Sequence, residues 1–409
     1  MDFEELVPLD HPVRGLWAMV EALDLSEFYA AIEARGSTPG APATDPKILL
    51  SLWLYANVEG IGSARLLDRL CERDAPYRWI CGGVTVNHHL LADFRVAHGR
   101  KLDNLMTQVI AALMKRGLAK LKRVAHDGMK VRASAGAASF RRRQSLERCL
   151  KEAQEQVRKL RREVEEDGGA SSRREKSARE RAAAERQANI EAALETMAEL
   201  EKKQAAPDRQ SPSVVKRRKE PRVSTTDPAA RVMKMPDGGY RPAYNVQLAT
   251  DESGVIVGAD VTNEGTDYAH VAPMLDELKR RTGQTPADYL VDGGYVKLEN
   301  IDVISSRGAT PYAPVPSPKK GKNLAADPYE PKPGDSPAVA AWRVRMKTDE
   351  AKRIYVQRGS LAERTNAELR AQRRLDRLNV RGLAKVKAVV LLGALALNLM
   401  KLVSLGGPA

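Results

Sequence analysis

Two aspartates in this sequence follow short β-prone runs and are followed at once by glycine. In "KRVAHDGMK" Asp127 precedes Gly128, and in "YLVDGGYVK" Asp292 precedes Gly293. Each aspartate is therefore predicted at the end of a strand, where the glycine releases the chain. Both could be simple turns, but carboxylates that converge from neighbouring strands repel each other, which favours neutralisation by a divalent cation. Ligation by oxygen atoms alone suits Mg²⁺ or Mn²⁺.

A third acid, Glu363, stands at the predicted start of a helix in a strongly basic segment. Between Glu363 and Lys387 the chain has eight Lys or Arg residues and three acids. Arg370 is predicted on the same helical face, about 10 Å along the axis. Judged alone, Glu363 fits an ordinary i,i+4 charge pattern equally well, and Glu368 is the alternative third acid.

The elements that would position these acids alternate between strands and helices. The segment after about residue 117 predicts an α/β domain with a mixed sheet and flanking helices. Helices are expected at 267–283, after Asp292 and after 337. Strands are expected at 118–125, 240–251, 255–265, 289–291 and 309–315.

Residues 1–117 predict an all-helical domain, which we expect to bind DNA. One helix begins with Asp45 as its N-cap before Pro46. A second is expected over 62–74, and a third between a Thr85 cap and a Gly99 stop. Three short helices are compatible with a helix-turn-helix and equally with a small bundle that does not bind DNA.

Residues 140–222 predict a charged helical hairpin inserted into the α/β domain. A return helix is expected over 177–203 after a turn at Asp167–Gly169, and 204–222 reads as a flexible basic linker. Apolar residues at alternating spacings of four and three form a heptad seam among the charges. They are Leu146, Leu150, Ala153, Val157, Leu160 and Val164.

Composition restricts the class of protein. Basic residues exceed acidic ones by 67 to 53, a formal net charge of +14, which indicates a polyanionic partner, nucleic acid before membrane. The three cysteines form no short pair, so a disulfide framework or a zinc site is not expected and a reducing cytosol fits. The N-terminus carries no apolar signal segment. No P-loop motif is present, which disfavours a P-loop ATPase.

The most apolar segment is expected to be a buried helix. It runs from Ala388 to Leu397 between lysines and falls short of the ~18 apolar residues of a membrane span. We therefore expect no membrane association.

The order of these motifs resembles that of bacterial insertion-sequence transposases of the DDE class with an InsH-type N-terminal domain. Within that class the chain is similar to the insertion-sequence group eleven-eighty-two, and the likeness extends over most of the chain. The N-terminal blocks are "TDPKILLSLWLYANVEG" and "TVNHHLLADFR". The blocks of the catalytic part are "AHDGMKVRASAG", "STTDPAARVMK", "AYNVQLATD", "YLVDGGY", "YVQRGSLAERTNAELRAQRRL" and "ALALNLMKL".

The resemblance implies an RNase H-like fold whose first and fourth strands lie side by side. Asp127 and Asp292 would then be neighbours, and Glu363 would come from a following helix. The catalytic domain would span 118–409, interrupted by the 140–222 insertion. Two Mg²⁺ ions, for which Mn²⁺ can substitute, would lie roughly 3.5–4 Å apart between the three acids.

The resemblance also implies DNA contacts from the glutamate block. Related transposases carry a tyrosine, an arginine, the glutamate and a lysine at set spacings, which match Tyr355, Arg358, Glu363 and Arg370 here. Arg358 lies one residue further from the glutamate than in that pattern, and Arg370 replaces the lysine. Arginine keeps the charge and adds bidentate geometry for a phosphate. Asp227 is a family-like acid to which no role is assigned.

The function implied is DNA transposition. The protein would hydrolyse phosphodiester bonds at the terminal inverted repeats and transfer the freed 3′-OH to target DNA, as a homodimer in the bacterial cytoplasm at the nucleoid. One alternative is an RNase H-like nuclease that cuts without joining. Another is a catalytically silent regulator descended from a transposase, which predicts the loss of at least one acid, whereas all three are present.

Overall fold

The computed structural model describes residues 2–30, 32, 43–166, 170–205, 220–316 and 327–404. The predicted turn at 167–169 and most of the predicted linker lie outside these ranges. The chain divides into two compact units. Unit 1 comprises Met1–Val131, Asn245–Asp376 and Ala384–Ala409, and unit 2 comprises Arg132–Tyr244 and Arg377–Leu383. The proposed domain boundary at residue 117 stays a prediction.

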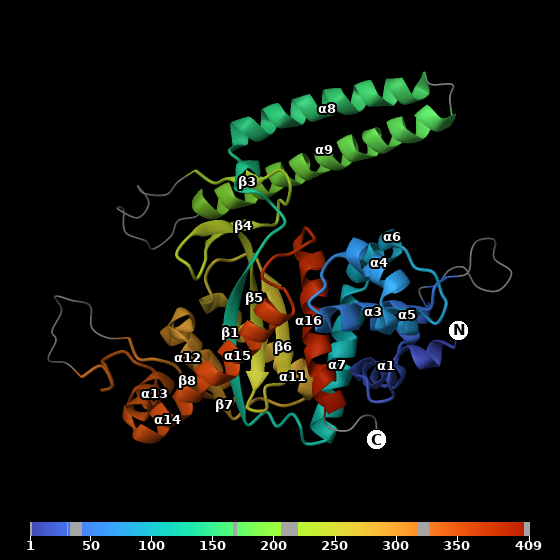
Figure 1. The fold of residues 1–409 in the computed structure, drawn as a ribbon. Coiled ribbons are helices and arrows are strands. Elements are labelled where there is room, and N and C mark those ends of the chain that lie inside the picture. The colour runs from blue at the N-terminus through green and yellow to red at the C-terminus, as the bar shows by residue number, and fades with distance from the viewer. Residues whose placement is uncertain are drawn as a thin grey trace. The chain divides into compact units, whose positions relative to one another are not determined.

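The centre of unit 1 is a mixed sheet with the strand order β6-β5-β1-β7-β8 (Figure 1). β1 pairs in parallel with β7, and β7 in parallel with β8, whereas β5 and β6 form an antiparallel hairpin. Along the chain β1 is the first and β7 the fourth of these five strands, and the two are neighbours, as predicted for an RNase H-like fold. The strands are β1 (Arg123–Arg132), β5 (Tyr240–Asp251), β6 (Ile256–Thr262), β7 (Asp288–Val291) and β8 (Thr310–Tyr312).

Helices cover this sheet because each presents an apolar face. α11 packs on β6 and on α7 (Gly99–Lys115) and buries Val271, Met274 and Leu278. Short 3₁₀ segments precede α11 and α12, at Tyr268–His270 and Gly293–Tyr295. The helices that follow β6 are α11 (Val271–Thr282), α12 (Leu298–Ser306), α13 (Pro337–Lys347), α14 (Asp349–Arg358), α15 (Arg364–Ala367) and α16 (Leu383–Ser404).

α16 is the apolar segment for which a buried helix was predicted, and that prediction is confirmed. Its length and composition would suffice for a membrane span, but 72% of its most apolar window is buried within the protein, as in a core helix. Asn398 joins it to the sheet, because its side chain accepts from the Ile256 amide at 3.0 Å and donates to the Ile256 carbonyl at 2.8 Å.

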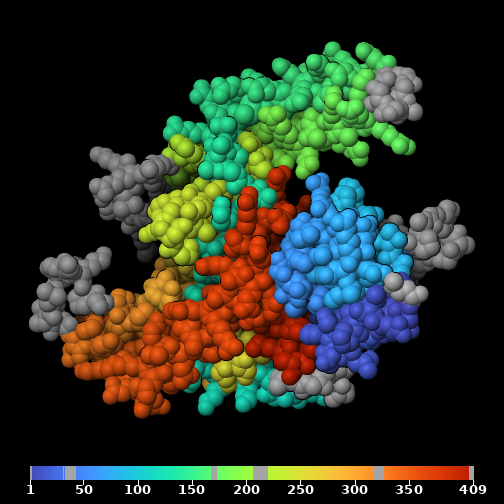
Figure 2. Space-filling model, in the orientation of Figure 1, coloured from blue at the N-terminus to red at the C-terminus, as the bar shows by residue number. Residues whose placement is uncertain are grey.

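The N-terminal residues are helical, as predicted. α3 begins at Pro46 and is capped by Asp45, whose carboxylate accepts from the Lys47 amide. Figure 2 shows one face of unit 1. The N-terminal helices (blue) and the C-terminal segment (orange to red) both contribute to it. The elements are a 3₁₀ turn at Phe3–Leu6, α1 (Pro12–Glu21), α2 (Ser26–Ala30), α3 (Pro46–Val58), α4 (Ala64–Arg73), α5 (Ala75–Cys81), α6 (His88–Ala97) and α7 (Gly99–Lys115).

Two predicted helix boundaries in this region are wrong. α6 is capped by Asn87 rather than Thr85, because the Asn87 side chain accepts from the Leu90 amide at 2.9 Å. Gly99 does not end the chain's helical course but begins α7. His98 interrupts the helix, and the chain resumes as a longer one whose apolar residues face the core.

Unit 2 contains the predicted charged hairpin, formed by α8 (Arg143–Glu165) and α9 (Ala170–Ala205), which lie side by side (Figure 1). Leu146, Ala153 and Val157 of the predicted seam are buried. Arg143 forms an ion pair with Glu201 across the two helices. At the base, β2 (Phe140–Arg141) pairs antiparallel with β3 (Val223–Ser224). β4 (Arg231–Lys234) pairs antiparallel with residues 240–243 of β5, and a short 3₁₀ turn spans Ala137–Ser139.

Candidate active site

Asp127 lies within β1, and Asp292 follows directly after the last residue of the neighbouring parallel strand β7. The register of β1 and β7 ends with His126 opposite Val291, so each aspartate is the next residue along the chain. The two carboxyl groups are close enough for the charge of Asp292 to raise the pKa of Asp127. The structure therefore brings these two predicted site residues together.

The prediction that Asp127 ends its strand is wrong. β1 continues from Asp127 to Arg132, so Gly128 does not release the chain. Gly128 is required for another reason, since a Cβ atom at this position would lie 2.4 Å from Asp267 Oδ1 and 2.8 Å from Gln247 Nε2. The glycine thus admits polar side chains close to the strand, directly beside Asp127.

Asp127 lies in a partly buried, charged environment. Burial raises the pKa of its carboxyl group to about 6, the Arg358 guanidinium opposes this rise, and the charges of Asp292 and Asp267 add to it. Arg358 Nη1 lies 3.9 Å from Asp127 Oδ1, and Asn366 Nδ2 donates to Asp127 Oδ2 at 2.9 Å. The site therefore concentrates negative charge that a cation would neutralise.

Glu363 does not start a helix, contrary to the prediction. The helical segment begins at Asp349, where Thr348 caps it by accepting from the Ala351 amide and two acids occupy the first turn. Glu363 ends a π-helical stretch, Gly359–Glu363, and a second one covers Glu368–Gln372. π-Helical turns are rare and occur often at functional sites.

Arg358 lies between Glu363 and Asp127 and is close to both. The Glu363 side chain is 72% exposed, and its Oε1 lies 3.8 Å from Arg358 Nη2. Within the described ranges, no group of three or more His, Cys, Asp or Glu residues is placed to hold a metal ion. The paired aspartates are therefore the organised part of the site, and Glu363 shares with Asp127 only the contact to Arg358.

The three predicted DNA-contacting residues are placed differently. Tyr355 and Arg358 lie half-buried on α14, and burial raises the pKa of Tyr355 while the Arg358 charge lowers it. Arg370 lies half-buried on the second π-helical stretch. Glu368, the alternative third acid, pairs with Arg373 at 3.1 Å. The assignment of Glu363 as the third acid stays a prediction.

A polar network next to Gly128 is not apparent from sequence motifs. Its centre is Asp267, whose pKa is lowered because its hydrogen bonds and the Lys130 charge outweigh the effect of burial. Asp267 Oδ1 accepts from Lys130 Nζ at 3.1 Å, Asn245 Nδ2 at 2.6 Å and Gln247 Nε2 at 2.9 Å. The available signal was Asn245 and Gln247, two polar residues on one face of an apolar strand.

Substituting Gly128 by Ala should disturb this network. The added methyl group meets three polar atoms within 3 Å, so the network or β1 must shift, at a cost of roughly 1–3 kcal/mol. We expect a lower melting temperature and slower DNA cleavage. Gly136→Ala is the matched control, since nothing lies within 4 Å of its added Cβ. Equal behaviour of the two variants would show that the network does not constrain β1.

Asn366 is a second residue that sequence motifs did not reveal. It donates to Asp127, and its own Oδ1 is buried without a hydrogen-bond partner. Asn366→Ala removes a hydrogen bond to a charged acceptor, which should slow single-turnover cleavage about tenfold. Asn366→Asp keeps the shape but sets a second negative charge against Asp127, so its rate should fall further. An Asp variant as active as the wild type would exclude this role.

Two other polar residues in the motifs, His126 and Asp227, are buried and form hydrogen bonds within the fold. His126 is fully buried, its Nδ1 lies 2.7 Å from the Tyr289 hydroxyl, and burial lowers its pKa to about 3, so the ring is neutral. Asp227, in unit 2, accepts from the Tyr244 hydroxyl at 2.7 Å and the Gly382 amide at 3.2 Å. The family-like Asp227 therefore holds together parts of unit 2.

Two family models match the chain. Residues 213–399 match the transposase DDE domain, and residues 1–97 match the transposase domain (DUF772). Asp292 and Glu363 lie within the first range, whereas Asp127 lies between the two. No curated protein and no solved structure matches the chain.

The fold and the two matched domains define an insertion-sequence transposase. The chain belongs to the DDE transposases, whose members generally use divalent metal ions. Its particular insertion-sequence group stays a prediction.

Proposed function

We propose that this transposase cuts and joins DNA at a site formed by Asp127, Asp292 and Glu363. The observation that carries the proposal is the adjacency of Asp127, within β1, and Asp292, directly after the parallel strand β7. The charge of Asp292 and the burial of Asp127 make this pair costly without a cation. If Asp127 had only a structural role in a turn, neither the Asp292 carboxylate nor Arg358 would be needed beside it.

The donor set fits divalent ions. It offers carboxylate oxygens, and the buried Oδ1 of Asn366 is an unpaired oxygen beside Asp127. Asp127, Asp292 and Glu363 would hold two Mg²⁺ ions, for which Mn²⁺ can substitute, and bound ions would supply an activated water and stabilise the leaving 3′ oxygen. Glu363 would first have to leave Arg358, with which it is now in contact.

The protein's own groups position the DNA. Asn366 orients the Asp127 carboxylate, and Arg358, once released from the two acids, is free to bind a phosphate with Tyr355 beside it. Arg370 would bind a further phosphate. The N-terminal helices would recognise the terminal inverted repeats. A homodimer in the cytoplasm, at the nucleoid, would pair two ends, hydrolyse the phosphodiester bonds and present the 3′-OH groups to target DNA.

The test is a cleavage and joining assay. A labelled duplex that carries the element's end is incubated with the protein, Mg²⁺ and a supercoiled target plasmid. Cleaved ends joined to the plasmid support transposition. Cleavage without joining indicates a nuclease, and binding without cleavage in Mg²⁺ or Mn²⁺ indicates a regulator.

DNA binding should weaken steeply with salt. The formal charge of +14 implies that phosphate contacts release counterions. For six to ten such contacts, the affinity for an end duplex should fall roughly 10³- to 10⁵-fold between 50 and 200 mM salt. Fluorescence anisotropy across a salt series measures this slope. Arg370→Ala should lower the slope by about one, and an unchanged slope would remove Arg370 from the DNA contact set.

A further inference from the structure

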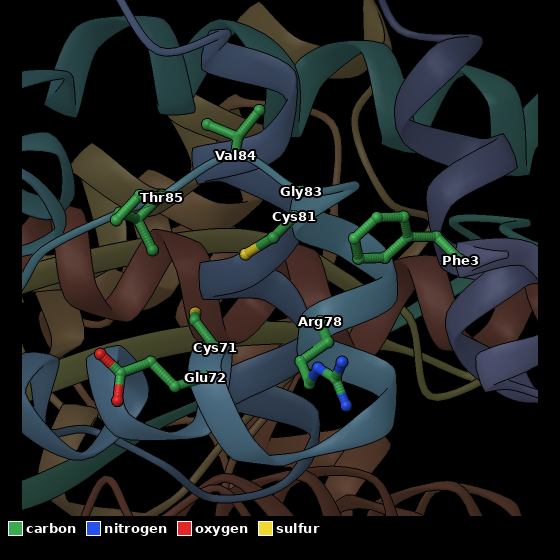
Figure 3. A pocket seen from close by; sticks show the side chains of 9 residues that line it. Phe3, Cys71, Glu72, Arg78, Cys81, Gly83, Val84 and Thr85 are labelled. Atoms are coloured by element: carbon green, nitrogen blue, oxygen red, sulfur yellow. The ribbon is translucent and has the colours of Figure 1, made fainter. Parts of the chain in front are cut away.

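A small pocket in the N-terminal helices is lined by two cysteines. Its volume is about 210 Å³, and Cys71, Cys81, Arg78 and Glu72 contribute to its wall (Figure 3). Phe3 closes one side. The pocket lies in the region that matches DUF772 and contains none of the proposed active-site residues.

The two thiols face each other. Cys71 lies near the end of α4 and Cys81 is the last residue of α5, and the two helices pack together. In Figure 3 the sulfur atoms point toward one another. The interaction with Cys81 raises the pKa of the Cys71 thiol, and the interaction with Cys71 lowers the pKa of the Cys81 thiol against the effect of burial.

The backbone holds the cysteines in this position. Asp74 ends α4 and begins α5, and Gly82, with a left-handed φ of 53°, ends α5 directly after Cys81. Cys81 is buried, whereas Cys71 is partly exposed at the pocket. Among the residues that the structure describes, the two thiols do not belong to any group of three or more His, Cys, Asp or Glu residues placed to hold a metal ion.

We propose that Cys71 and Cys81 are an oxidation site that forms a reversible disulfide with peroxide. The Cys81 thiolate attacks a peroxide oxygen and breaks the O–O bond, which gives a sulfenic acid and, after protonation, one water. The Cys71 sulfur then attacks the sulfenic sulfur, and the second water leaves with the Cys71 proton. Two thiols are oxidised and one hydrogen peroxide is reduced to two waters. Thiol exchange with a cellular reductant restores the pair.

The disulfide ties α4 to α5 within the N-terminal helices. The sulfur atoms that it joins already point toward one another in the reduced protein. Local opening of the segment from Cys71 to Cys81 should become rarer, and its backbone amides should exchange hydrogen more slowly. This inference does not depend on the proposed active site.

The test is mass spectrometry on the full-length protein. The reduced protein is treated with hydrogen peroxide, quenched with N-ethylmaleimide under denaturing conditions and digested. We expect a peptide link between Cys71 and Cys81, an intact mass lower by two hydrogens before alkylation, and one alkylated cysteine of the three, Cys149. Dithiothreitol should restore all three thiols.

Cysteine variants provide the controls. Cys149→Ser lies in unit 2 and should leave the linked peptide unchanged. Cys71→Ser should abolish the link and leave a sulfenic acid on Cys81 that reacts with dimedone. The proposal is overturned if Cys149→Ser keeps both remaining thiols alkylatable after peroxide. It is also overturned if the only disulfides join separate chains, or if Cys81 is oxidised beyond the sulfenic acid without a link.

Discussion

Asp127→Ala and Asp292→Ala should each abolish cleavage of a transposon-end duplex while DNA binding persists. Either substitution leaves one carboxylate where two now stand side by side, in β1 and directly after β7. Loss of one ligand removes several kcal/mol of transition-state stabilisation, so the single-turnover rate should fall roughly 10³-fold or more. Denaturing gels of a labelled duplex measure the rate, and anisotropy measures binding.

Alanine variants of three further acids test whether the loss of cleavage is specific to the proposed site. Asp276→Ala is the matched control, because Asp276 is 63% exposed on α11 and pairs with Arg307 away from the site. It should cut at the wild-type rate. Glu363→Ala should be inactive and Glu368→Ala active. The reverse pattern would reassign the third acid, and full activity of Asp127→Ala would reduce Asp127 to a strand residue without a catalytic role.

Arg281→Met should destabilise unit 1 strongly. The Arg281 side chain is fully buried, with ion pairs to Asp103 of α7 and Glu277 of α11 and a hydrogen bond to the Asp103 carbonyl at 2.9 Å. Methionine fills much of the space but leaves two partly buried carboxylates without their cation. Removal of one partner from such a buried pair costs about 3–5 kcal/mol. Urea unfolding followed by circular dichroism measures the loss.

The neighbouring arginine supplies the control. Arg280 pairs with the same Asp103 at 2.8 Å, but its side chain is 52% exposed. Arg280→Met should therefore cost less than about 1 kcal/mol. Equal losses for the two variants would mean that Asp103, and not burial of the arginine, determines the effect.

The strand that ends at Asp292 was predictable because its signals are local. A β-prone run, an aspartate and two glycines place the strand end correctly, and the Asp292 carboxylate accepts from the Gly294 amide at 2.8 Å. The same reasoning misplaced the end of β1. Gly128 stays within the strand because Asp267 and Gln247 approach it closely, and both come from segments more than 100 residues later in the chain.

The surroundings of Glu363 were less predictable. The sequence directly before Glu363 is basic and contains no proline, so it does not reveal that the helix already begins at Asp349 after the Thr348 cap. It also does not reveal that the helix widens into π-helical turns. Asn366 looks like any polar helix residue until the fold brings it to Asp127. Local patterns identify the acids, whereas the residues that orient them are identified only by contacts across the fold.

The separation of Asp127 and Asn366 along the chain has a consequence for the protein as it is being made. These hydrogen-bonded residues are 239 positions apart. At about 5–20 residues per second, a ribosome needs roughly 10–50 s to travel between them. Throughout that interval the nascent chain carries its first aspartate without the groups that orient it. A newly made transposase therefore becomes competent late in its own translation, when much of its N-terminal part has already emerged beside the messenger RNA.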